Sequence, residues 1–182
     1  MEVKKLVILG GPSCIGKSYL IKKIRRGELP FVCEQLGISS DTPSVEAGAL
    51  SQGEGYYPRM ILHYDFVRQM RGGRIRMLPE AVDVSERVTY VTLVATRRAL
   101  RHRVRKRLKR HLYGILHGSW PEVRYGARFL PSLPIYFNPR GLDALYQRWY
   151  DFIAAHPGER WTLDTSTDQV VISPYPRGAP LE

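Results

Sequence analysis

The feature that most constrains the fold is an apolar run that leads directly into a glycine-rich loop and then into a helical pattern. Residues 6–9 are all apolar and β-branched at their centre, which predicts a strand buried within a parallel sheet. Residues 10–16 include three glycines, and residues 18–26 repeat apolar side chains at helical spacing. A strand joined to a helix in this way is the first half of a βαβ unit, so we expect an α/β fold.

The rest of the chain alternates apolar runs with helical patterns. Strands are predicted at residues 30–33, 59–66, 88–95 and 160–163, and helices from about residue 97 and over residues 141–155. Gly114 and Gly118 are expected to loosen the end of the first helix, and residues 119–140, with four prolines, to form a loop with a short helix. Residues 173–182 are expected to be an extended or frayed tail. We predict one domain over residues 1–182, with a mostly parallel five-stranded sheet and helices on both faces.

The chain carries a net charge of +11, which favours anionic partners such as nucleotides, phosphorylated metabolites, nucleic acid or acidic membrane surfaces. Its two cysteines form neither a disulfide framework nor a zinc motif, so a reducing cytoplasm is the expected location. The N-terminal apolar run is shorter than the core of a signal peptide, and no stretch approaches the ~20 apolar residues of a membrane span. We expect a cytoplasmic protein without a membrane span, and the sequence leaves its oligomeric state open.

Residues 11–18 match the phosphate-binding pattern G-x-x-x-x-G-K-[ST] at every fixed position. Glycines let the backbone turn so that its N–H groups point at phosphate oxygens, and the following helix adds its positive N-terminal end. Together with the strand and the helix around it, the motif predicts a three-layer P-loop NTPase fold.

Each residue of this loop receives an expected role. Lys17 is expected to reach the β- and γ-phosphates of a nucleoside triphosphate, and Ser18 to bind Mg²⁺. Cys14 is expected to offer its backbone N–H, and the helix N-terminus to lower the pKa of its thiol. The residues expected to contact the triphosphate are Gly11, Pro12, Ser13, Cys14, Ile15, Gly16, Lys17, Ser18 and Tyr19.

Asp65 ends the apolar strand predicted at residues 59–66, at the sheet edge where α/β folds bind ligands. A carboxylate there can reach Mg²⁺ or take a proton from an acceptor hydroxyl. The alternative is that Asp65 caps a following helix or is solvated at the strand end. His63 alternates to the same side of the strand and is expected to be packed or hydrogen-bonded rather than catalytic.

Residues 97–110 contain nine arginines and lysines, and no acidic residue occurs between Arg87 and Pro121. The simplest interpretation is a solvated helix face. Nine positive charges over about four turns repel one another, so we favour a helix that binds an anion. The arginines expected to neutralise a migrating phosphoryl group stand in two pairs at i, i+4 spacing, Arg103 with Arg107 and Arg124 with Arg128.

The loop sequence GGPSCIGKS, the strand-end Asp65 and the segment LRHRVRKR at residues 100–107 together resemble the adenylate kinase-like group of small P-loop kinases for nucleotides and metabolites. In that group an L-x-x-R-x-x-x-R run precedes a mobile lid, so the resemblance implies a basic lid region over residues 97–130. It also implies that Arg103 lies near the nucleotide base or phosphates, and Arg107 near the transferred phosphoryl group.

The segment WTLDTS at residues 161–166 resembles the last strand and the adenine-holding loop of the same group, which implies that Asp164 and Thr165 contact the nucleotide. The S-x-T-T-R pattern of guanylate kinases is missing, so GMP is not assigned as the acceptor. Neither an N-K-x-D nor a D-x-x-G pattern occurs, which disfavours a regulatory GTPase.

The phosphate acceptor is expected to dock against residues 34–59, a stretch rich in glycine, serine and proline. Asp41 is either an acceptor base, in the manner of small-metabolite kinases, or a turn residue. The residues expected to contact the acceptor are Asp41, Glu54, Tyr57 and Arg59.

Three functions are compatible with these patterns. The leading hypothesis is an ATP-dependent phosphotransferase, with GTP as the other donor, that moves the γ-phosphoryl group of a Mg²⁺-bound triphosphate to a small-molecule or nucleotide acceptor. The second makes the acceptor a nucleic-acid end, because four aromatic residues lie near the arginines: Tyr113, Trp120, Tyr125 and Phe129. The third is a non-catalytic nucleotide-sensing module that uses the basic helix as a partner surface.

Overall fold

The computed structural model describes residues 3–50, 56–70, 75–167 and 170–174, and its centre is a six-stranded sheet with the order β2-β3-β1-β4-β5-β6. The first five strands are parallel, and β6 joins β5 in the antiparallel sense. The strands are β1 (Lys5–Gly11), β2 (Ser44–Glu46), β3 (Arg59–Asp65), β4 (Val88–Val94), β5 (Glu159–Asp164) and β6 (Val171–Pro174). The prediction of an α/β fold with a mostly parallel sheet is confirmed, but the predicted number of five strands is wrong.

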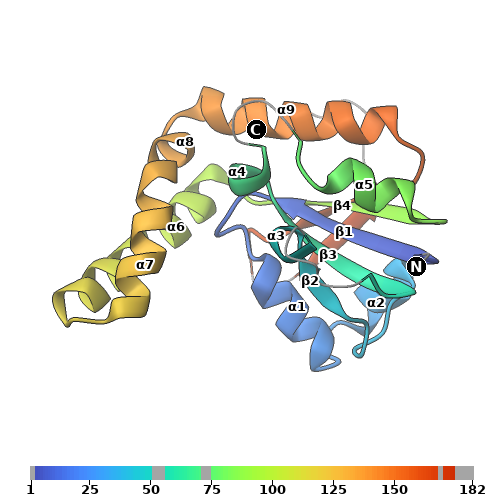
Figure 1. The fold of residues 1–182 in the computed structure, drawn as a ribbon, viewed down its shortest axis with the longest axis horizontal. Helices are drawn as coiled ribbons and strands as arrows, with labels where there is room; N and C mark the ends of the chain where they lie inside the picture. Colours follow the sequence, from blue (N-terminus) through green and yellow to red (C-terminus); the bar gives the residue numbers. More distant parts are fainter. Residues whose placement is uncertain (1–2, 51–55, 71–74, 168–169, 175–182) are drawn as a thin grey trace.

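Helices cover both faces of this sheet (Figure 1). Helices α1 (Lys17–Arg25) and α2 (Pro30–Leu36) lie against one face, and α5 (Leu78–Asp83) and α9 (Pro139–Ala155) against the other. Because β1 is the third of six strands and is covered on both sides, its residues from Leu6 to Gly11 are all buried. Burial on both faces explains why its sequence is a continuous apolar run without alternation.

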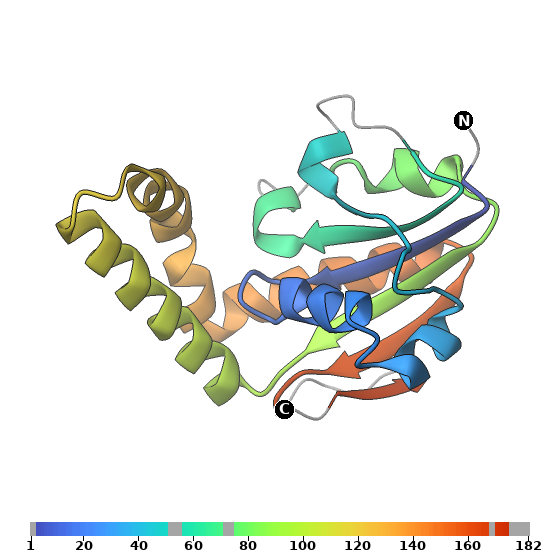
Figure 2. The ribbon, with the colours of Figure 1, turned by 90° about the horizontal axis from the view of Figure 1, so that it is seen from below.

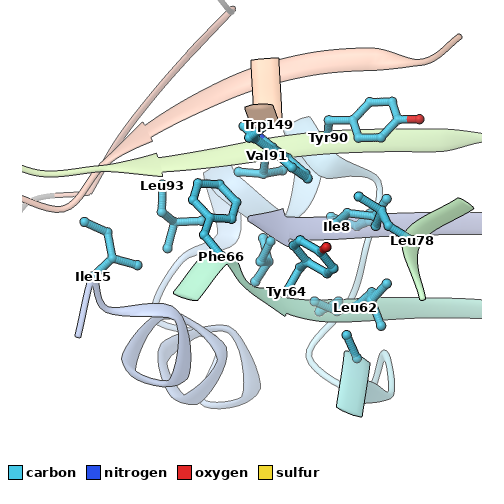
Figure 3. Packing of buried hydrophobic residues seen from close by; sticks show 14 of the residues in the cluster. Ile8, Ile15, Leu62, Tyr64, Phe66, Leu78, Tyr90, Val91, Leu93 and Trp149 are labelled. Carbon is cyan, nitrogen blue, oxygen red and sulfur yellow. The ribbon is translucent and has the colours of Figure 1, made fainter. Parts of the chain in front are cut away.

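Trp149 of α9 is the largest fully buried side chain, and it packs over the carboxyl end of β1 (Figure 3). Its ring lies beside those of Tyr64 and Phe66, at centroid distances of 5.9 and 5.2 Å. Its Nε1 donates a 2.7 Å hydrogen bond to Thr92 Oγ1, so the one polar atom of the indole is satisfied inside the core. A Cβ added at Gly10 would lie only 2.6 Å from this ring, so the close packing requires glycine there.

Two predicted assignments are wrong because prolines in the first turns of helices were interpreted as strand or loop residues. Residues 30–33 were predicted as a strand but begin helix α2, with Pro30 in its first turn and Gly37 ending it at a φ of 57°. Residues 119–140 were predicted as mostly loop, but they form a nearly continuous helical path. It comprises α7 (Trp120–Phe129), the 3₁₀ turn η2 (Leu130–Ser132), α8 (Leu133–Phe137) and the start of α9. All four prolines of this stretch stand in the first turns of these elements, where the missing N–H costs nothing.

Helix α6 (Arg97–Leu116) pairs with α7 to form a two-helix arm that projects away from the sheet (Figure 2). The expectation that Gly114 loosens α6 is wrong, because the helix continues to Leu116. A Cβ on Gly114 would lie 2.6 Å from the side chain of Glu122, so this glycine lets α7 approach α6.

Two short helices complete the elements of the described ranges, α3 (Ala47–Leu50) and α4 (Phe66–Gln69). The predicted tail is a strand up to Pro174, and residues 175–182 lie outside the described part of the chain. None of the helices in the described ranges is long and apolar enough to cross a membrane.

Candidate functional site

The carboxyl ends of β1 and β3 meet at one edge of the sheet, where Gly11 and Asp65 are partners in the strand register. The glycine-rich loop, residues 11–16, leaves β1 at this edge and leads into α1. Two of its residues have a positive φ, 66° at Cys14 and 116° at Gly16. The second of these conformations favours glycine, so Gly16 shapes the turn into the helix.

Lys17 begins α1 and turns back over the loop. Its Nζ donates a 2.8 Å hydrogen bond to Pro12 O and a second bond to Gly11 O. The side chain is buried, and this burial lowers the pKa of Lys17 to about 8 against the opposing effect of Asp65. The amine is therefore held inside the loop, where its charge is poorly solvated.

Asp65 is fixed by three hydrogen bonds. It accepts one from Ser13 Oγ of the glycine-rich loop, and its other oxygen accepts from Val67 N at 3.0 Å and Arg68 N at 3.4 Å. Burial alone would raise the pKa of this carboxyl, but Lys17, the Ser13 hydroxyl and Arg68 together hold it below its ordinary value. The structure confirms the helix-capping interpretation, since Asp65 caps α4, and it also places the carboxylate against the glycine-rich loop.

Next to Asp65 lie three residues that the sequence did not single out as a group. Glu46 at the end of β2 is the register partner of His63, and its Oε1 lies 3.8 Å from His63 Nδ1. Burial and the nearby Lys17 lower the pKa of His63 to about 4, so this histidine is neutral at pH 7. Arg68 follows in α4 and is exposed. The signal missed for Glu46 is that the three residues SVE form a short parallel strand, which brings their acid to the same edge.

Arg103 joins the glycine-rich loop to the loop that follows β5. Its guanidinium donates to Ile15 O at 3.0 Å and to Thr165 Oγ1 at 3.1 Å, with a further bond to Thr165 O. The Thr165 hydroxyl in turn lies 2.6 Å from Ile15 O. The neighbouring Asp164 is exposed and accepts a 2.7 Å hydrogen bond from Ser166 N. The structure therefore brings Arg103 and Thr165 to the loop, while Asp164 shapes the turn beside it.

Arg107 reaches the same loop from the next turn of α6. Its Nη1 lies 3.8 Å from Cys14 Sγ, and its guanidinium stacks over the ring of Phe129 at 4.8 Å. The pKa of the Cys14 thiol is raised by burial, which outweighs the opposing influence of Arg107. The expectation of a lowered thiol pKa at Cys14 is therefore wrong, because the side chain is removed from water.

Three cavities adjoin one another along this edge. The smallest, of 230 Å³, is lined by Lys17, Ser18, Asp65 and Arg107 together with Glu46 and His63. A cavity of 640 Å³ shares Cys14, Gly16, Tyr19 and Arg107 with it and extends along α6 to Thr165. A third cavity of 470 Å³ shares Ser13 and Arg68 with the smallest one and lies between α4 and the segment that runs from the end of α7 into η2. The smallest cavity therefore stands between the other two.

Of the predicted acceptor residues, the three that the structure describes do not line these cavities. Arg59 begins β3 and is exposed, six residues and therefore roughly 20 Å from Asp65 along the strand. Tyr57 precedes it, and Asp41 is an exposed turn residue before the start of β2. These three residues lie toward the amino ends of the strands, opposite to the glycine-rich loop, and Glu54 lies outside the described residues.

The second pair of predicted arginines belongs to α7. Arg124 is exposed on this helix, and Arg128 lies one turn further along it. Arg103 and Arg107 make the loop contacts given above, whereas Arg124 stands exposed on α7.

Oxygen ligands for a hard cation are present at the smallest cavity. Ser18 and Asp65 line it, as predicted for a magnesium site, and Glu46 adds a second carboxylate. Magnesium is usually held by one or two carboxylates together with substrate phosphates, so this donor set fits the ion. Within the described ranges, no three His, Cys, Asp or Glu side chains gather closely enough to hold a metal ion by themselves.

Comparisons of the chain with protein-family models, with curated proteins and with solved structures found no match.

Proposed function

We propose that this protein is an ATP-dependent phosphotransferase, a small P-loop kinase whose glycine-rich loop binds the triphosphate. The observation that supports this most is the position of Lys17, Asp65 and Arg107 around one small cavity that joins two larger ones. A transferase needs a donor site and an acceptor site that meet at a charged centre from which water can be excluded. The two larger cavities and the small one between them fit that requirement.

The nucleoside triphosphate occupies the 640 Å³ cavity in this proposal, with ATP as the leading donor and GTP as the second. Its volume lies within the ~300–1,000 Å³ of ordinary ligand pockets. Its phosphates extend along the glycine-rich loop into the smallest cavity, where Lys17 contacts the β- and γ-phosphates. Magnesium, held there by Ser18 and Asp65, supplies positive charge to the phosphate oxygens.

The acceptor occupies the 470 Å³ cavity beside Ser13 and Arg68 in this proposal. That position replaces the docking region at residues 34–59 that the sequence had indicated. An acceptor in this cavity lies on the far side of the smallest cavity from the nucleoside, which is the arrangement needed for in-line transfer. Arg68 gives the cavity a positive side chain, so we expect an acceptor that carries an anionic group beside its hydroxyl.

Arg107 is the arginine that we propose for the migrating phosphoryl group. It lines both the donor cavity and the smallest cavity, whereas the donors of Arg103 are engaged with Ile15 and Thr165. We therefore assign Arg103 the role of holding the glycine-rich loop against the loop that follows β5. Asp65 would organise the metal or accept the proton of the acceptor hydroxyl.

The direct test is turnover of ATP to ADP with a metabolite library and mass detection of a phosphorylated product. We expect an anionic acceptor to give a product in the wild-type protein and none in Lys17→Ala, with Lys22→Ala, an exposed lysine of the same helix, as the matched control. Normal turnover by Lys17→Ala would exclude this mechanism. Tight ATP binding without transfer to any acceptor would instead favour the nucleotide-sensing module.

A further inference from the structure

Helix α6 has three distinct faces, and the proposed function uses only one of them. Leu100, Val104 and His111 are buried against the rest of the protein. Arg103, Lys106, Arg107 and Arg110 line the 640 Å³ cavity. At 100° per residue, eight further side chains fall within an arc of about 120° on the remaining side. This outer face consists of Arg98, Arg101, His102, Arg105, Lys109, Leu112, Tyr113 and Leu116.

The first three turns of the outer face are cationic. Arg98, Arg105 and Lys109 are exposed. A cavity of 700 Å³ is lined by Arg98, Arg101, His102 and Arg105 of this face, together with Arg103 from the neighbouring one. The ion pairs that α6 makes lie on its other sides, Arg97 with Asp143 at 3.0 Å and Arg110 with Glu122 at 3.7 Å. Among the residues that the structure describes, no carboxylate lies within 4 Å of a cation of the outer face.

The last turns of the outer face are apolar and aromatic instead. Tyr113 is 65% exposed and Leu116 83% exposed, and Trp120 at the start of α7 is 76% exposed. The Tyr113 ring is stacked on His117 with a centroid distance of 3.9 Å, which holds it in place. These residues belong to the end of α6 and the start of α7, where the two helices meet at the far tip of the arm (Figure 2). Large aromatic side chains that are exposed at a protruding tip are available to bind a partner, and apolar groups gathered on a surface often mark interaction sites.

We propose that the outer face of α6 and the tip of the arm form a docking surface for single-stranded nucleic acid. The cations from Arg98 to Lys109 cover about 16 Å along the helix, enough to follow several phosphates of one strand. Tyr113 and Trp120 then offer ring faces on which unpaired bases stack. The order of charge followed by exposed rings suits a strand that runs along the helix toward its tip.

A lipid surface fits this helix less well. A helix that lies in a membrane interface carries apolar side chains along its whole length, with cations on the opposite side. On α6 the apolar residues of the outer face are confined to Leu112, Tyr113 and Leu116, and the first three turns of the same face are only basic and polar. The charged residues of α6 therefore precede the apolar ones along the same face. An interfacial helix would instead place the two kinds of residue on opposite sides.

The cations of the docking surface and the residues of the proposed donor site stand on different faces of α6, although Arg103 lines a cavity on each side. Nucleic-acid binding is therefore independent of the proposed kinase activity. We expect Lys17→Ala to bind oligonucleotide as the wild-type protein does, and saturating ATP not to compete with it.

The test is fluorescence anisotropy of a labelled 20-nucleotide single strand, titrated with the full-length protein at several salt concentrations. We expect the triple variant Arg98→Gln/Arg105→Gln/Lys109→Gln to bind at least tenfold more weakly. The slope of log affinity against log salt should fall by about 2, because each phosphate that the protein neutralises contributes about 0.7 to that slope. The matched control is Lys22→Gln/Arg87→Gln/Arg148→Gln, which removes three exposed cations from other parts of the chain and should weaken binding by less than threefold.

A second variant tests stacking without changing charge. Tyr113→Ala/Trp120→Ala should weaken binding of the single strand by at least tenfold and binding of a duplex by less than threefold. Circular dichroism of all variants checks folding. An equal decrease in affinity in the two charge variants, loss of binding in Lys17→Ala, or no salt-sensitive binding near physiological ionic strength would overturn the proposal. Binding of phosphatidylserine vesicles with no binding of oligonucleotide would overturn it in favour of a membrane surface.

Discussion

Arg107 Nε donates a 3.2 Å hydrogen bond to Nε2 of His111, one turn further along α6. Because this nitrogen accepts, the proton of the neutral ring resides on Nδ1, which faces the Glu122 carboxylate of α7. Glu122 thereby fixes the orientation of the buried His111 ring, and the ring fixes the guanidinium of Arg107 beside the glycine-rich loop. The arm is thus connected to the proposed site by one continuous path of side chains.

This path predicts a positioning role for His111. His111→Phe keeps an aromatic ring next to Phe129 but removes both hydrogen bonds, so the guanidinium of Arg107 loses its orientation. We expect kcat to fall by about 10–100-fold with less than a threefold change in KM for ATP, because a misplaced catalytic group costs rate more than binding. His117→Phe, at an exposed histidine of the same arm, is the control. Unchanged kcat in His111→Phe would show that Arg107 needs no such support.

The depressed pKa of Lys17 predicts how stability depends on pH. Its folded pKa of about 8 lies below the ordinary value of 10.5, so the unfolded chain holds more protons between these two pH values. Stability contributed by this group therefore rises with pH across that interval. Urea unfolding should show the wild-type protein gaining roughly 3 kcal/mol relative to Lys17→Met between pH 8 and pH 10.5. If the free energies of unfolding of the two proteins changed in parallel with pH, the burial of a charged amine would be contradicted. The control Lys22→Met should show the pH dependence of the wild type.

The sheet was predictable from the sequence where its strands are six or seven residues long. The runs that became β1, β3, β4 and β5 are long enough to be recognised without knowledge of their neighbours. Strands β2 and β6 have three and four residues, and each forms only because a neighbouring strand offers its edge. The helical path after residue 119 was missed because prolines in first turns are indistinguishable from loop prolines until the helix boundaries are known.

The candidate site was predictable where one continuous motif carries it. The glycine-rich loop and Asp65 converge because both follow neighbouring parallel strands, as expected. The acceptor region was assigned to residues 34–59 from the types of residue found there, and residue types do not say at which end of a strand a residue lies. The positions of Arg68 and Glu46 at this edge of the sheet depend on the register of β2 and β3, which a single sequence does not reveal.

Asp65 allows the two interpretations of its role to be separated by one substitution. Asparagine caps a helix about as well as aspartate, so Asp65→Asn should keep the bonds from Val67 N and Arg68 N and change the free energy of unfolding by less than about 1 kcal/mol. It removes the charge, so we expect turnover to fall by about 100-fold or more. Asp65→Ala should lose the cap as well and destabilise the protein by about 1 kcal/mol. Wild-type turnover in Asp65→Asn would leave Asp65 with the structural role alone.

The close packing of Trp149 on Gly10 predicts a large effect from one added methyl group. All three atoms nearest to a Cβ at Gly10 belong to the indole of Trp149, and the ring is held by its bond to Thr92. Because the ring cannot withdraw without breaking that bond, Gly10→Ala should destabilise the protein by about 1–3 kcal/mol in urea unfolding. The control is Gly141→Ala in α9, where the atom nearest to an added Cβ is Ile135 Cα at 3.6 Å, and this substitution should be neutral or stabilising.

Gly10→Ala also tests how the core is linked to the proposed site. Gly10 directly precedes Gly11, the residue at which β1 ends and the loop begins. If the methyl group displaces the end of β1, Lys17 is displaced with it, and ATP affinity should fall even where the protein remains folded. In the double variant Gly10→Ala/Trp149→Phe, the smaller ring makes room for the methyl group. Its loss of stability should therefore be smaller than the sum of the losses in the two single variants. Full additivity would mean that Trp149 is not the obstacle and that the strand end adjusts in another direction.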